Sequence, residues 1–188
     1  MDGPFLWYLN RGTGLVLLVL LTVTVVVGVL ATRGRPGRVV PRFVVQTLHR
    51  DLAVLSVGLL TVHVLSAVLD EYVDIRWWQV LVPVGSTYEP FWLGLGTVAT
   101  QLLGVVVLSS ALRRWMSLRA WRALHLSVHL AWVLSVAHGL GIGTDTRSPA
   151  AAPLYLACIG AVAVAVLLRL GGLAIRGRRA PLHGGVAR

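Results

Sequence analysis

Five of the six histidines in this sequence lie inside strongly apolar stretches. His49 and His63 belong to one stretch, and His125, His129 and His138 belong to another. Ionisable side chains are costly inside a membrane and usually mark ion paths or cofactors there, and histidine is a ligand for transition metals and haem iron. Five histidines on two segments therefore predict a cofactor or ion site within the apolar part of the protein.

The spacing of these histidines places them at two levels along their helices. His49 and His63 are 14 residues apart, close to four helical turns, so they lie near one face and roughly 21 Å apart along the axis. His125 and His138 are 13 residues apart, which gives a similar separation of roughly 20 Å but a rotation of about 140° on an ideal helix. A helix bend or the reach of the side chains must absorb that rotation.

The elements that must position the histidines are membrane spans. The chain has 188 residues, of which 56% are hydrophobic, and its mean hydropathy of +0.79 is too high for a soluble domain. No segment between the apolar stretches is long enough to bury a core of its own. The sequence predicts an all-α membrane protein, a single domain over residues 1–188 with a bundle of five transmembrane helices. The predicted spans, each near the roughly 20 residues that cross a bilayer, are 14–31, 48–69, 91–112, 121–141 and 152–175.

The arginines predict how this bundle is oriented. All 17 basic residues are arginines, and they give a formal net charge of +10. They gather in the connections 32–47 and 113–120 and after residue 175, whereas the connection 70–90 holds four acidic residues and one arginine. The positive-inside rule then places the N-terminus outside and the tail 176–188 in the cytoplasm. Arginines beside anionic lipid explain the positive charge, and no nucleic-acid partner is expected.

In this topology the second and fourth spans both start at the cytoplasmic side and run parallel. His49 and His125 then lie at the inner level, and His63 and His138 lie at the outer level. Each pair is able to hold a haem iron from opposite sides, in the bis-histidine ligation that favours electron transfer.

Two other functions also fit histidines inside a membrane. Histidines that hydrogen-bond between helices would make the chain a haemless scaffold, and a series of histidines would suit a small proton or metal transporter. A transporter would normally add intramembrane carboxylates, and only Asp51, beside Arg50 at the inner boundary, comes near. Bound haem discriminates between these functions and electron transfer.

Two segments, LHRDLAVLSVGLLTVHVLSAVLD and WRALHLSVHLAWVLSVAHGLG, carry His49-x13-His63 and His125-x12-His138. In these segments the chain resembles the ferric reductase-like transmembrane domain family. That family includes NADPH oxidases, ferric reductases and the haem subunit of the bacterial methionine sulfoxide reductase system. The resemblance extends over about residues 7–175 and is closest to the short bacterial members, which implies a multi-pass protein of the cell (plasma or inner) membrane.

The resemblance implies transmembrane electron transfer through two b-type haems. By motif, His49 and His125 would bind the iron of the inner haem, and His63 and His138 that of the outer haem. The donor would be a cytoplasmic flavoprotein or quinol, and the acceptor outside would be ferric iron, oxygen or a partner reductase. No FAD or NAD(P)H site is expected in this chain, which would be the haem subunit of an oxidoreductase.

Several further residues near the inner level are expected to contribute. His129, one turn after His125, stands where the family often has an aromatic residue, so it would pack beside a haem or replace His125 as a ligand. Arg42, Arg50 and Arg122 near the inner boundary would pair with haem propionates, because guanidinium groups bind carboxylates well. The alternative for these arginines is that they only set the topology.

Overall fold

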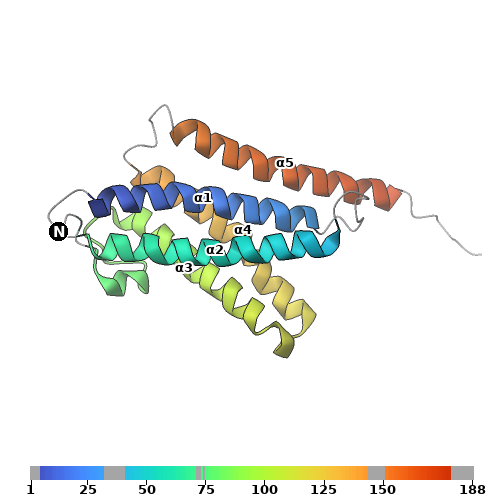
Figure 1. The fold of residues 1–188 in the computed structure, drawn as a ribbon, viewed down its shortest axis with the longest axis horizontal. Helices are drawn as coiled ribbons and strands as arrows, with labels where there is room; N and C mark the ends of the chain where they lie inside the picture. The colour runs from blue at the N-terminus through green and yellow to red at the C-terminus, as the bar shows by residue number, and fades with distance from the viewer. Residues whose placement is uncertain (1–4, 32–40, 71–72, 74, 144–150, 179–188) are drawn as a thin grey trace, which may run out of the picture.

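The computed structural model describes residues 5–31, 41–70, 73, 75–143 and 151–178. In these residues the fold consists of long α-helices with two short 3₁₀ helices, η1 and η2 (Figure 1). Five helices are long and apolar enough to cross a membrane, so the predicted all-α, five-span fold is confirmed and the chain is a multi-pass membrane protein. The elements are α1 (Phe5–Ala31), α2 (Arg42–Val68), η1 (Trp77–Val80), α3 (Pro90–Ala111), η2 (Arg113–Trp115), α4 (Leu118–Ile142) and α5 (Ala151–Arg178).

The helices reach beyond the predicted spans. α1 begins at Phe5 rather than at residue 14, and α2 begins at Arg42 rather than at residue 48. α5 continues to Arg178, so the first residues of the predicted tail are helical, and residues 179–188 lie outside the described residues. Hydropathy marks only the segment that crosses the hydrocarbon core, whereas a helix can continue into the interface where polar side chains are tolerated.

Local signals set the starts of three helices. Pro41 precedes α2, and Pro90 is the first residue of α3, where a missing backbone N–H does no harm. At the start of α4, the hydroxyl of Ser117 accepts the backbone N–H of Ala120 at 3.2 Å, a common N-cap interaction.

Two antiparallel hairpins form the bundle. α1 packs along α2, α3 packs along α4, and α1 also contacts α4 and α5 (Figure 1). Among the described helices, α2 and α4 make little close contact with each other. They are also the least buried spans, with 11% and 17% of their apolar windows buried, compared with 39% for α1. The two histidine-bearing helices are therefore positioned by α1 and α3 rather than by direct packing against each other.

The apolar core follows α1. Leu17 and Leu21 pack in one cluster with Trp132 of α4, which is only 7% exposed. The indole N–H of Trp132 donates to the hydroxyl of Thr22 at 2.9 Å, and that hydroxyl donates to the carbonyl of Leu18 at 2.8 Å. These bonds satisfy the polar atoms of a buried interhelical contact.

The connection between α2 and α3 folds back onto α3. The hydroxyl of Thr97 donates to the carbonyl of Gln79 at 2.8 Å, and the side-chain amide of Gln101 donates to the carbonyl of Leu81 at 2.6 Å. Gln79 lines the same cavity as His63. The 3₁₀ helix η1 thus closes the end of the bundle at which His63 lies.

Candidate functional site

The structure brings the four predicted ligands together in two pairs. The rings of His49 on α2 and His125 on α4 have their centroids 6.1 Å apart and an interplanar angle of 62°. His63 and His138 line one cavity near the other end of the same helices. We call His49 and His125 the inner pair, and His63 and His138 the outer pair, after their predicted sides. α2 and α4 consequently run in the same direction.

Three of these histidines are held by the same kind of hydrogen bond. A backbone carbonyl oxygen can only accept, so an Nδ1 that bonds to it must carry the proton, and Nε2 keeps its lone pair. Histidines that bind a metal usually donate their second ring nitrogen in this way. Each bond joins the ring to a neighbouring helix: His49 to the carbonyl of Thr24 at 3.1 Å, His63 to Asn10 at 3.1 Å and His138 to Trp92 at 2.8 Å.

A glycine follows each of these carbonyls by four residues and lies against the same imidazole. Ordinary contacts between carbon atoms are about 3.5–4.0 Å, so a larger residue would press on the ring. A Cβ atom would lie 3.2 Å from Cε1 of His49 at Gly28, 3.1 Å from Cε1 of His63 at Gly14 and 2.6 Å from Nδ1 of His138 at Gly96. We call each carbonyl with its glycine a notch, because together they set the position and the direction of one imidazole.

His125 occupies a variant of this notch. Its Nδ1 lies 3.4 Å from the hydroxyl oxygen of Ser110, which itself donates to the carbonyl of Val106 at 2.7 Å. Because the one hydroxyl proton of Ser110 is used on Val106, its oxygen is the acceptor for Nδ1–H of His125. Val106 and Ser110 each follow Trp92 and Gly96 by 14 residues, so serine stands where the other notches have glycine.

The notch residues carry a sequence signal that the histidine spacing alone does not reveal. Gly14 and Gly28 on α1 are 14 residues apart, the same spacing as His49 and His63 on α2. Two antiparallel helices with equal spacings keep both contacts in register. On α3 the spacing is again 14, but on α4 it is 13. That difference coincides with the longest of the four contacts, the one between His125 and Ser110.

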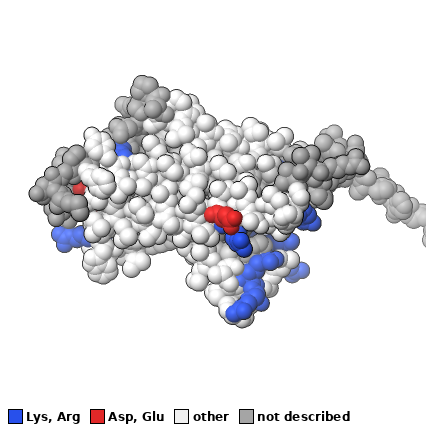
Figure 2. Space-filling model, in the orientation of Figure 1, with Lys and Arg blue, Asp and Glu red and all other residues white. Residues whose placement is uncertain are grey.

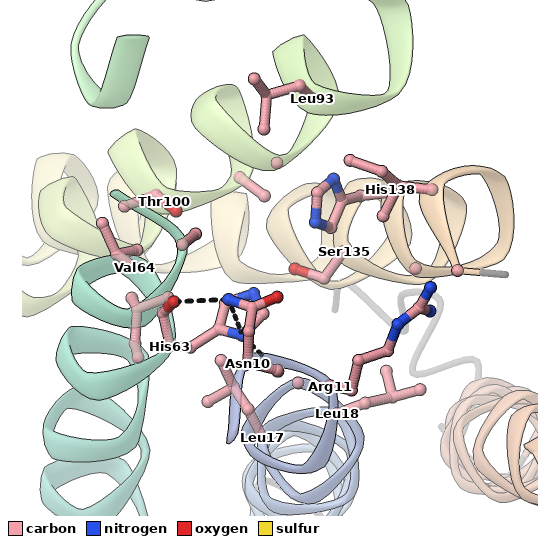
Figure 3. Close-up of a pocket in the computed structure, with 18 of the residues that line it drawn as sticks. Asn10, Arg11, Leu17, Leu18, His63, Val64, Leu93, Thr100, Ser135 and His138 are labelled. Carbon is pink, nitrogen blue, oxygen red and sulfur yellow. Dashed lines mark hydrogen bonds between the residues drawn. The ribbon is translucent and has the colours of Figure 1, made fainter. Parts of the chain in front are cut away.

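Asn10 also ties α1 to α2 beside the outer pair. Its side-chain amide nitrogen donates to the carbonyl of His63 at 2.8 Å and to the hydroxyl of Ser66 at 3.2 Å (Figure 3). The backbone carbonyl of the same residue accepts from the His63 ring. Asn10 therefore holds both the helix and the imidazole of His63.

A cavity of about 450 Å³ lies at the outer pair. Figure 3 shows His63 and His138 on different helices around it, with Arg11 of α1 nearby. A mostly apolar cavity with a few polar groups is typical of a cofactor site. Its apolar wall includes Leu17, Leu18, Leu21, Leu60 and Leu103, and its polar groups include Asn10, Gln79, Thr97, Ser135 and Tyr155.

The other predicted site residues lie apart from the pairs. Arg50 contacts the carboxylate of Asp51 at 3.4 Å, and both side chains are exposed. Arg42 and Arg122 are exposed as well. His129 has its Nδ1 3.1 Å from the carbonyl of Leu126 in its own helix. The ring contact with α2 at this level is made by His125.

The arrangement suits a porphyrin better than a bare ion. In the described part of the chain, no three histidine, cysteine, aspartate or glutamate side chains are grouped to hold a metal ion. A porphyrin supplies four nitrogens of its own, so one histidine pair completes a six-coordinate iron. No protein-family model, curated protein or solved structure matches this chain.

Proposed function

We propose that this protein carries electrons across the cell membrane with two b-type haems, one at the inner pair and one at the outer pair. The single observation that carries the proposal is the notch, repeated three times with glycine and once with serine. Each notch takes up Nδ1–H of one histidine and leaves its Nε2 free as a ligand. Haem b at these sites would supply a one-electron couple between ferric and ferrous iron.

The inner pair has the spacing that one iron requires. Two imidazoles that bind a metal from opposite sides, with metal–nitrogen bonds of about 2 Å, have ring centres about 6 Å apart. The 6.1 Å between the centroids of His49 and His125 agrees with this spacing. Histidines that merely hydrogen-bonded to each other would face nitrogen to nitrogen, yet here each Nδ1 points to a different helix.

The outer pair supports the same role through its cavity. The cavity supplies apolar walls for a flat hydrophobic ring system, and the notches at Gly14 and Gly96 hold the two imidazoles at its edge. The polar groups among its lining residues, such as Asn10 and Tyr155, suit the propionate end of a porphyrin. This site therefore has room, ligands and a polar edge.

The proposed direction of transfer follows from the surface charge. Blue arginine atoms gather over the end of the α3–α4 hairpin, the end at which the inner pair lies (Figure 2). The positive-inside rule assigns that end to the cytoplasm. A cytoplasmic flavoprotein or a quinol is then the donor, and ferric iron, oxygen or a partner reductase is the acceptor outside. The resemblance to the ferric reductase-like family supports the same direction.

The test is a reduced-minus-oxidised absorption spectrum of the purified protein with haem counted per chain. We expect low-spin b-type bands and two haems in the wild type, and about one haem in each of His63→Ala and His138→Ala. His129→Ala is the matched control on α4, and it should keep both haems because its ring bonds only within its own helix. Wild-type protein without haem, expressed with ample haem, would refute the proposal in favour of a haemless scaffold or a small transporter.

A further inference from the structure

An aromatic stack links the inner pair to the arginine-rich end of the protein. Trp121 lies one turn before His125 on α4, and the two rings stack with centroids 5.0 Å apart and planes 25° from parallel. The guanidinium carbon of Arg113 lies 4.6 Å from the centre of the same indole. One side chain thus contacts both a predicted ligand and a cation.

The indole N–H of Trp121 is buried and has no acceptor. Among the side chains that the structure describes, Nε1 of Trp121 is the buried nitrogen or oxygen without a hydrogen-bond partner. Trp132 on the same helix, by contrast, donates its indole N–H to Thr22 at 2.9 Å. Leaving a buried donor unpaired is unfavourable, and an indole nitrogen can only donate. The missing partner is therefore an acceptor that a ligand supplies.

The charges around this donor select an anionic acceptor. Arg113 and Arg114 lie in η2, just before α4, and Arg119 and Arg122 are exposed in the first turns of α4. Clustered cations raise the local potential and attract anions. A guanidinium binds carboxylate or phosphate oxygens with its fork of N–H donors.

We propose that Trp121 and Arg113 together bind a carboxylate of the porphyrin held by the inner pair. This inference rests on the proposed function, and it deepens that function by naming the residues that bind the propionate. It also replaces the sequence-based expectation for Arg50, whose guanidinium contacts Asp51. A phospholipid phosphate offers the same chemistry, so the experiment has to separate the two sources.

The experiment measures haem release to excess apomyoglobin from the His138→Ala variant, in which only the inner pair binds haem. Trp121→Phe is added to this background because it keeps the aromatic stack and removes only the N–H. Trp132→Phe is the matched control on the same helix, and Arg113→Gln is a second, exposed variant that leaves the core intact. Each protein is loaded either with haem or with haem dimethyl ester, which lacks the carboxylates.

We expect Trp121→Phe to release haem roughly tenfold faster or more, the loss expected for one hydrogen bond to a charged group. Release of the dimethyl ester should be the same with and without Trp121→Phe. Equal acceleration for both porphyrins would mean that Trp121 acts only by packing on His125, and it would overturn the inference. No acceleration, with less co-purified anionic phospholipid, would assign the N–H to a lipid phosphate instead. Wild-type protein without haem would refute the proposed function as well, so the two failures are distinguishable.

Discussion

Replacing Gly96 with alanine tests whether the notches position the ligands. The added Cβ would lie 2.6 Å from Nδ1 and 2.7 Å from Cε1 of His138. Ordinary contacts at these atoms are about 3.5 Å, so the imidazole must retreat by roughly 0.9 Å. Metal–ligand distances tolerate only about 0.2 Å. His138 therefore cannot keep both its bond to the carbonyl of Trp92 and its place as a ligand.

The fold itself should survive this substitution. Overpacking a well-packed site costs about 1–3 kcal/mol, and alanine in place of glycine returns up to about 1 kcal/mol in helix propensity. The net loss in the free energy of unfolding is then at most about 2 kcal/mol, which leaves α3 and the distant inner pair in place. The expected result is a fall from two haems per chain to about one, with the remaining haem at the inner pair.

Haem per chain, a reduced-minus-oxidised spectrum and circular dichroism would be measured together on the purified variant. Gly104→Ala is the matched control on α3, because a Cβ at that position meets nothing within 4 Å. The substitutions Gly14→Ala and Gly28→Ala should have smaller effects, since their closest ring contacts are 3.1 Å and 3.2 Å. If Gly96→Ala kept two haems with an unchanged spectrum, the notch would not be what positions His138.

The other predictions concern the serine notch and the topology. Ser110→Gly should keep both haems, because it frees the carbonyl of Val106 to accept from the inner histidine as in the other three notches, whereas Ser110→Val should lose the inner haem by pressing on that ring; haem counting with equal haem for both variants would contradict this. In intact cells, an impermeant maleimide should label Thr87→Cys but not Arg119→Cys, since both positions are exposed and the native Cys158 is buried. The reverse labelling pattern would invert the proposed direction of electron transfer.

The sequence by itself determined the class of the fold and the levels of the histidines. Five apolar stretches of spanning length predict five membrane helices because hydropathy and helix length are properties of a continuous segment. The 14- and 13-residue spacings predict which histidines share a depth, because the rise per residue of a helix is nearly constant. His49 with His125, and His63 with His138, follow from those two facts and the parallel course of their helices.

Only the tertiary structure decided what each side chain contacts. Depth along a helix says nothing about the neighbour that a ring faces, so the carbonyl of Trp92 and the cradle at Gly96 could not be read from α4. The same limit applies to Arg50, which pairs with Asp51 on the exposed face of α2. It also applies to the unpartnered N–H of Trp121. These contacts depend on how the helices are rotated and packed against each other, and that packing is a property of the whole bundle rather than of any one segment.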